Sequence, residues 1–412
     1  MKISLTNLTY VIIGFVSTSV FAQQPISLEQ AVQTALQKNQ LIKSAEYQVE
    51  YFKQVKKTST DIGKLSAVWM HGQYNSLYQD NNLTFVQTLP FPTLLGSQIQ
   101  LGKEQVIGAQ KSLRSTQNDL VFEVKSVYYQ LLYLEALNKL LQSQDSLYED
   151  FSRASSLRYK TGESNLLEKT TAETQLMEVR NQSRINQADI QIAASKLQAL
   201  LRNETSVIAS DILKKRELPQ AVDTISLAGN PQLSYLRQQA TIGQRAKRVE
   251  RNRLLPDISV GYFNQTLFGI QNINGQDQFF GRDKRFQGFE LGLSIPLWFG
   301  PHLARTKAAA FNEEILKKNA EHFQTTLTGT YGQALQELDK NLSSLDYYES
   351  SALKNAELIL VQARKAYRGG EIGYIEYLQS LKNAIAIKSN YLQALNLYNH
   401  SVVKIEFLLG TI

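Results

Sequence analysis

Tyr159-x-x-Gly162-Glu163-x-x-Leu166-Leu167-Glu168 is the stretch that decides the fold, because it returns 208 residues later as Tyr367-x-x-Gly370-Glu371-x-x-Tyr374-Ile375-Glu376. Each copy lies between two long segments with a helical pattern. Each half of the chain also carries a pair of strand-like, alternating segments before its copy. A repeat of this kind fixes the architecture before any single residue is interpreted. The sequence therefore predicts two internal repeats, each made of two strands and a long helical hairpin.

The first residues favour export. Lys2 precedes an apolar stretch from Leu8 to Val20, and Val20-Phe21-Ala22 follows. This is the pattern of a secretory signal peptide, which predicts cleavage after Ala22 and a mature chain of residues 23–412. The chain has no cysteine, so it has neither a disulfide framework nor a residue for lipid attachment at the cleavage site.

The charge pattern argues against a nucleic-acid partner. The formal net charge is +7, but the positive residues are spread along helical segments with acidic residues between them, as on solvated faces. The eight prolines fall at segment junctions, which leaves the long helical segments unbroken.

The first repeat is expected over residues 23–203. Residues 28–63 are helical in pattern, with Ser27 as N-cap. Alternation over residues 65–91 predicts a hairpin, with Val68 and Met70 in one row and Trp69 in the other. A helical hairpin over residues 96–203 follows, with a left-handed stop at Gly162 and a helix cap at Asn165. A helix of some 60 residues is roughly 90 Å long.

The second repeat, residues 227–412, follows a linker over residues 204–226 and repeats the order of the first. A short helix precedes a hairpin over residues 256–298, in which Phe289, Leu291 and Leu293 alternate with Gly288, Glu290 and Gly292. A helical hairpin over residues 302–409 completes the repeat. Its seam is a heptad-like row that includes Leu327, Leu345 and Leu381.

Strands with one apolar face and one small or polar face are typical of membrane barrels. Four strands cannot close a barrel, and open edges are not tolerated in lipid. Three protomers would supply twelve strands, enough for an open lumen. The expected fold class is therefore mixed membrane α/β: a trimeric β-barrel with four strands per protomer, continued by a long α-helical barrel. A soluble hairpin packed on helices is the other interpretation of the strands.

The export signal, the duplicated strand pairs and helical hairpins, the proline-marked strand exits at Pro90 and Pro296 and the Tyr-x-x-Gly tips together resemble the TolC-like outer-membrane factors. The resemblance covers the whole mature chain. It implies a homotrimer in outer-membrane lipid with a periplasmic extension, which acts as the exit duct of a tripartite efflux system. Its implied partners are a periplasmic adaptor protein and an inner-membrane pump. Residues 225–255 look closest to the branch that works with heavy-metal resistance-nodulation-division pumps.

The resemblance also implies functional residues. Glu168 and Tyr367 match a tyrosine–carboxylate pair that links the two hairpins at a periplasmic gate, and Glu376 matches an acidic ring in the lumen. Helix capping is the other interpretation of both carboxylates. Two positions depart from the family pattern, since Ile372 replaces an arginine and Gln379 replaces a second ring acid. The tip residues resemble the groove where the adaptor docks: Tyr159, Gly162, Glu163, Gly370 and Glu371.

The sequence gives little support to an enzyme. The four histidines are scattered, and the chain has no nucleophile motif or phosphate-binding loop. No cofactor or tightly bound metal is expected. A periplasmic coiled-coil adaptor or structural spacer and a type I secretion duct remain the alternative functions. The transported substrate, whether metal cations or small toxic compounds, is set by the pump.

Overall fold

The computed structural model describes residues 24–203, 207–218 and 224–411. The predicted signal peptide, residues 1–22, lies outside the described residues. The chain divides into two compact units, one formed by Met1–Gln33 and Val127–Leu213 and the other by Thr34–Ser126 and Lys214–Ile412. These units do not follow the boundaries of the sequence repeats, because the long helix α3 (Pro92–Lys160) contributes to both.

The first unit is built on a helical hairpin. α3 turns at its tip into α4 (Leu166–Leu201), and the parallel strands β1 (Gln24–Ile26) and β4 (Val207–Ala209) pair beside it. The Tyr128 hydroxyl lies 2.9 Å from the carbonyl oxygen of Ile26 and 2.7 Å from a carboxylate oxygen of Asp211. The start of α1 (Leu28–Lys38) is capped as predicted, since the Ser27 hydroxyl accepts from the backbone N–H of Gln30.

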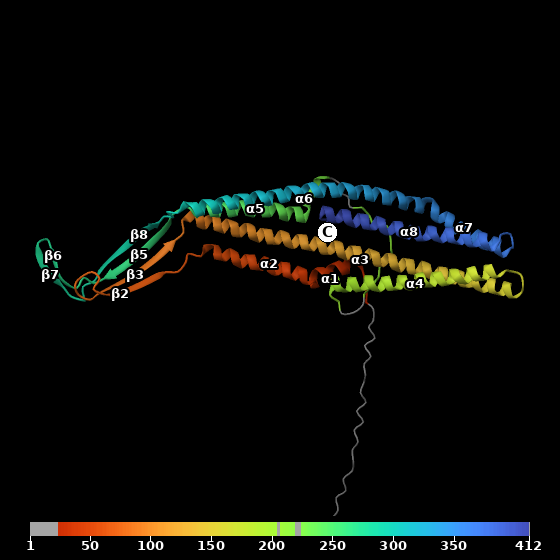
Figure 1. Cartoon of the computed structure of the whole chain (residues 1–412), viewed down its shortest axis with the longest axis horizontal. Coiled ribbons are helices and arrows are strands. Elements are labelled where there is room, and N and C mark those ends of the chain that lie inside the picture. Colours follow the sequence, from red (N-terminus) through yellow and green to blue (C-terminus); the bar gives the residue numbers. More distant parts are fainter. Residues whose placement is uncertain (1–23, 204–206, 219–223, 412) are drawn as a thin grey trace, which may run out of the picture. The chain divides into compact units, whose positions relative to one another are not determined.

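The second unit contains a four-stranded antiparallel sheet (Figure 1). Its strands are β2 (Ser66–Gly72), β3 (Asp80–Leu89), β5 (Asp257–Gln265) and β8 (Phe286–Ser294), in the spatial order β2-β3-β5-β8. Both predicted hairpins are present, and the pairing of β3 with β5 joins them into one sheet. β2 and β8 are therefore the edge strands.

The register assigns the side chains to two faces. Phe85, Tyr262 and Phe289 lie in one row across the sheet, and Val260 and Leu291 share their face. Trp69 lies opposite Leu83 on this apolar face. Val68 and Met70 share one row and Trp69 belongs to the other, as the sequence predicts, and the row of Val68 and Met70 lies on the opposite face with Thr84 and Gly288. Alternation alone defined the two rows of this strand, and only the pairing shows which row is which.

A third hairpin was not predicted. The connection after β5 contains β6 (Gly269–Ile273) and β7 (Gln276–Phe280), which pair antiparallel. Asn274 and Gly275 form the turn with φ values of 55° and 83°. Asn-Gly is the strongest short signal for a two-residue hairpin turn. This dipeptide alone would have predicted the hairpin, although the connection is polar and lacks the usual apolar alternation of strands.

The helices of this unit begin with α2 (Gln40–Lys57), which follows a cap at Asn39 and ends in a short turn, Thr58–Thr60. A second short turn, Thr224–Gly229, precedes α5 (Pro231–Asn252). α6 (Phe299–Tyr347) packs against α5, and α7 (Leu353–Arg368) forms a hairpin with α8 (Tyr374–Leu409). The expected continuous helix over 302–367 is thus interrupted by a π-helical turn, η3 (Tyr348–Ala352).

The predicted seam residues form the core. Val124, Leu327, Leu345 and Leu381 are all less than 5 % exposed, as the heptad-like spacing required. Small residues allow close helix approach at one point, since a Cβ on Gly243 of α5 would lie only 2.8 Å from a side-chain atom of Leu316 on α6.

Replacing Leu381 with alanine is expected to lower the thermal unfolding temperature of the helical hairpin. The side chain is 1 % exposed, and removing a buried leucine side chain costs about 2–5 kcal/mol. Circular dichroism of the purified chain measures the change, with Lys382→Ala on the exposed neighbour as control. Equal unfolding temperatures for the two variants would show that this seam does not stabilise α8.

Candidate functional site: the two hairpin tips

The same turn closes both helical hairpins. The N–H of Glu163 donates to the Arg158 carbonyl at 2.8 Å, and the N–H of Glu371 donates to the Ala366 carbonyl at 2.9 Å. Gly162 and Gly370, which directly precede these glutamates, have φ values of 77° and 75°. This is the αL termination that the sequence predicted, and glycine is favoured because it has no Cβ to clash in that conformation.

An ion pair between the helices also recurs at the repeat spacing of 208 residues. Arg180 lies 3.4 Å from Glu149 in the first hairpin, and Lys388 lies 2.7 Å from Glu357 in the second. All four side chains are at least 31 % exposed, so each pair contributes little to stability. The pairs nevertheless show that the two hairpins share their register as well as their sequence pattern.

Glu168 is held inside the first tip. Its backbone N–H donates to Asn165 Oδ1 at 2.9 Å, which confirms the predicted cap. Its carboxylate accepts from the Ser164 hydroxyl at 2.5 Å and lies 3.5 Å from Arg158. The residue is 4 % exposed. Because the carboxylate is buried beside a hydroxyl and a guanidinium, it is fixed by its own hairpin.

Glu376 occupies the equivalent position of the second tip but has a different environment. Ile372 stands where the first tip has Ser164, and Ala366 stands where it has Arg158. Neither side chain forms hydrogen bonds. The Glu376 carboxylate accepts instead from the Gly373 N–H at 3.1 Å and is exposed. One carboxylate of the repeat therefore serves the internal structure of its tip, whereas the other is presented to solvent.

The two tyrosines are also placed equivalently. Lys169 Nζ lies 5.5 Å from the ring centre of Tyr159. At the equivalent position of the second tip, Tyr377 stacks on Tyr367 with ring centres 4.5 Å apart and planes 7° apart. Lys169 and Tyr377 were not predicted as tip residues, although each lies ten residues after its tyrosine and the repeat spacing of 208 residues pairs them.

Exposed apolar side chains surround the first tip. Leu157, Leu166 and Leu167 are 65 %, 58 % and 64 % exposed, and Ile375 at the second tip is 66 % exposed. The acidic residues Glu163 and Glu371 are exposed beside them. Uncovered apolar groups next to a tight turn are typical of a protein-binding surface. The contact between Glu168 and Tyr367 that the family resemblance implies stays a prediction.

Within the described part of the chain, no three histidine, cysteine or carboxylate side chains are grouped so as to hold a metal ion. In the same residues no helix has both the length and the apolar character needed to cross a bilayer.

Comparison with known proteins gives the class. The structure resembles that of CusC over 96 % of this chain and 95 % of that one, with a TM-score of 0.76 and 16 % identity. It resembles the Campylobacter jejuni CmeC outer membrane channel over 100 % and 94 %, with a TM-score of 0.73 and 15 % identity. The Neisseria gonorrhoeae MtrE outer membrane channel matches over 93 % and 88 %, with a TM-score of 0.73 and 14 % identity. Identities this low establish the fold alone, which is that of outer-membrane channels.

Residues 224–411 match the family described as outer membrane efflux protein. This segment is nearly the second repeat of the sequence analysis. No curated protein matches the chain. The family match and the shared fold together confirm the resemblance to the TolC-like outer-membrane factors.

Replacing Asn165 with alanine is expected to loosen the start of α4. Loss of a side-chain cap costs about 1 kcal/mol of helix stability, so amide hydrogen exchange in the first turn of α4 should accelerate roughly fivefold. Asn181→Ala on an exposed turn of the same helix is the control and should leave that exchange unchanged. Unchanged exchange in Asn165→Ala would mean that the cap does not hold the tip.

Proposed function

We propose that this protein is the outer-membrane exit duct of a tripartite efflux system: a passive homotrimeric channel with a periplasmic helical gate. The exposed apolar face of the four-stranded sheet carries this proposal. Phe289 and Leu291 are each 83 % exposed, and Trp69 and Leu293 are 68 % and 65 % exposed. A contiguous apolar face of this kind is far more favourable in lipid than in water.

The opposite face suits a lumen. Ser66, Ser259, Gly261 and Ser294 share it with Glu290. Small and polar side chains of this kind line the interior of membrane barrels, whereas apolar side chains face the lipid. The sheet therefore has the two-sided character of a barrel wall.

The edges of the sheet favour several copies. β2 and β8 are the outermost strands, and their outer backbone groups need hydrogen-bond partners in a membrane, where no water is available. Pairing β8 of one copy with β2 of the next would supply these partners. Three copies would close a barrel of about twelve strands, which leaves an open lumen.

Exposed apolar residues on the long helices fit the same assembly. Met177, Ile185 and Ile192 of α4 are 69 %, 55 % and 67 % exposed, and each interval between them is close to one heptad. Such a row matches the seam between packed helices. Neighbouring copies would cover it in a periplasmic α-helical barrel.

The tips are proposed to carry gating and docking. Glu168 and Tyr367 would link the two hairpins in the closed state, and Glu376 would face the lumen as a ring of three carboxylates. Carboxylates that close together disfavour one another's ionisation and attract cations. The exposed tip residues Gly162 and Gly370, with their apolar neighbours, would receive the hairpin of a periplasmic adaptor. The adaptor would connect the duct to a resistance-nodulation-division pump for metal cations or small toxic compounds.

Single-channel recording in planar bilayers tests the duct and its gate. Wild-type protein should insert with low conductance, and Glu168→Ala/Tyr367→Phe should raise it severalfold, because the proposed link between the hairpins is lost. Asp339→Ala/Tyr347→Phe, at exposed positions of α6, is the matched control.

The outcomes separate the parts of the proposal. Insertion with unchanged conductance in the tip variant would disprove the assigned gate contact but leave the channel. Failure of the wild-type protein to insert would disprove the barrel and favour a periplasmic coiled-coil spacer.

Docking is tested by Gly162→Trp. The backbone at Gly162 has a positive φ, and no atom lies within 4 Å of the position that a Cβ would take. The turn therefore has room for the ring at a strain of about 1–2 kcal/mol, while the bulky side chain would block an incoming hairpin. Trimers are expected on native gels, but the cells should lose resistance to the metal salts or dyes that the pump exports.

Gly329→Trp is the control, since Gly329 of α6 is exposed with equally open space around it. Resistance that survives Gly162→Trp would remove the tip from the docking surface.

A further inference from the structure

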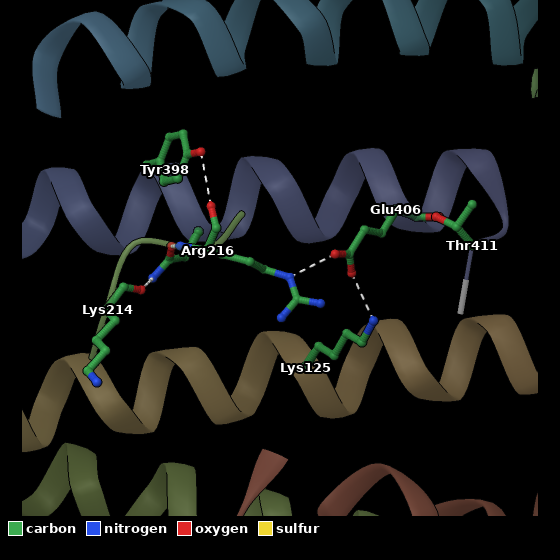
Figure 2. Close-up of polar contacts among 7 residues, drawn as sticks. Lys125, Lys214, Arg216, Tyr398, Glu406 and Thr411 are labelled. Atoms are coloured by element: carbon green, nitrogen blue, oxygen red, sulfur yellow. Dashed lines mark hydrogen bonds and ion pairs between the residues drawn. The ribbon is translucent and has the colours of Figure 1, made fainter. Parts of the chain in front are cut away.

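Residues 214–216 cross α8 and are held there by hydrogen bonds; we call them the strap (Figure 2). Asn399 Oδ1 accepts from the backbone N–H of Arg216 at 2.9 Å, and Asn399 Nδ2 donates to the Lys214 carbonyl at 2.9 Å. The Tyr398 hydroxyl donates to the Arg216 carbonyl at 3.1 Å. Asn399 and Tyr398 are 0 % and 2 % exposed. The strap is therefore bound to two buried side chains of α8 through partly buried hydrogen bonds, which cost free energy to break.

A buried ion network strengthens this attachment. Glu406 of α8 accepts from Arg216 Nε at 2.7 Å and from Lys125 Nζ of α3 at 2.8 Å (Figure 2). The exposed fractions of the three side chains are 10 %, 23 % and 12 %. Removing one member would leave an uncompensated charge in a poorly hydrated place. The strap is thus a fixed point shared by α3 and α8.

Lys215 of the strap makes contacts of a different kind, with carboxylates near the end of α6 and with the ring of Tyr398, 5.4 Å from its Nζ. Its Nζ lies 3.1 Å from Asp346 at the end of α6 and 3.7 Å from Glu349 in η3. Burial lowers the pKa of Lys215, but the hydrogen bond to Asp346 and the two negative charges outweigh this effect and raise it overall. The three side chains are 36–58 % exposed. Ion pairs this exposed are weak and are screened by salt.

The contact falls on an irregular point of the helix. In η3 the Leu353 N–H donates to the Tyr348 carbonyl, five residues back, so this turn is wider than an α-helical turn. Wide turns of this kind are sites where helices bend and frequently lie at functional positions. Before the turn, α6 packs against α5 and α8, whereas after it α7 packs against α8.

The buried face of the helix from η3 through α7 consists of small side chains. Ala352, Ala356 and Ala363 are the buried residues of η3 and α7. Alanine side chains do not interlock with the grooves of a facing helix as leucine side chains do. Movement of α7 along α8 would therefore disturb few interlocking buried side chains, although it would strain the exposed Glu357–Lys388 pair and the stacked rings of Tyr367 and Tyr377.

We propose that Lys215 is a releasable latch that holds the helix in its observed form at η3. While Lys215 pairs with Asp346 and Glu349, the strap fixes the start of the wide turn. When the pairs break, the helix bends at η3 and α7 moves against α8, while the strap stays bound to α8 and α3. This inference does not depend on the proposed function. In a duct, release of the latch would let the α7–α8 hairpin move while the strap stays fixed to α3 and α8.

Spin labels on the two sides of η3 test the latch directly. The chain has no cysteine, so Asp339→Cys and Arg364→Cys give two unique labels, about 37 Å apart along a straight helix. Labelled full-length protein is diluted with unlabelled protein, so that pulsed electron spin resonance measures distances within one chain. We expect one narrow distance for the wild type, and an additional shorter population after Lys215→Met or at high salt.

Two further variants make the result decisive. Lys354→Met, at an exposed position in the first turn of α7, should leave the single distance unchanged. Deleting Ser350 should convert the wide turn to a regular α-helical turn and remove the shorter population from Lys215→Met. Helical circular dichroism checks that each variant is folded, and Lys215→Gln replaces Lys215→Met if that variant misfolds.

The latch is disproved if folded Lys215→Met keeps the single wild-type distance. It is equally disproved if the shorter population persists after deletion of Ser350, because bending would then not need the wide turn. Neither outcome involves conduction or export, so failure of the latch is distinguishable from failure of the proposed duct.

Discussion

The pairing of β3 with β5 is the interaction on which the sheet depends. It joins residues 82–89 to residues 258–265, and thereby unites two hairpins that the chain forms far apart in sequence. A two-stranded hairpin alone is marginally stable in water. Once the four strands are joined, one face carries a continuous row of large apolar side chains, and most of the small residues lie on the other. The exposed apolar side chains and the unpaired outer edges of β2 and β8 are the observations that support the proposed membrane barrel of several copies.

Duplication gave the molecule two tips with one backbone and two chemistries. The turn hydrogen bonds, the positive-φ glycines and the pairs Arg180–Glu149 and Lys388–Glu357 recur at one spacing. The change of Ser164 to Ile372 removes the hydroxyl that holds Glu168 in the first tip. Glu376 is consequently exposed, although it occupies the same position in its repeat. The two tips have the same backbone because the same local hydrogen bonds form in each. Single side-chain differences determine whether the equivalent glutamate is buried or exposed to solvent.

In the second unit, the strap makes strong contacts with α8 and weak contacts with the end of α6 and with η3. Glu406 and Asn399 bind the strap by buried contacts, whereas Lys215 reaches Asp346 and Glu349 in a partly solvated place. Buried pairs resist salt and exposed pairs do not. The segment that connects the two repeats therefore has a structural role of its own, next to the point where the helix is irregular.

The sequence by itself determined the local elements. The predicted end of the last helix, the caps at Ser27 and Asn165 and the glycine turns all depend on side chains within a few residues of one another, and the structure confirms them. The buried seam followed from heptad spacing for the same reason. The Asn274-Gly275 turn is equally local, and an Asn-Gly pair by itself favours a two-residue hairpin turn.

The tertiary structure alone decided the rest. The order of the strands in the sheet depends on β3 meeting β5, although five described elements lie between these two strands in the sequence. The face of the sheet on which Trp69 lies follows from the same pairing. The pairing of Arg216 and Lys125 with Glu406 joins three distant segments, and no spacing in the sequence encodes it. The wide turn of η3 lies inside a helical pattern that the sequence gave no reason to interrupt. Such features arise from contacts between remote residues, and these exist only after the elements have packed.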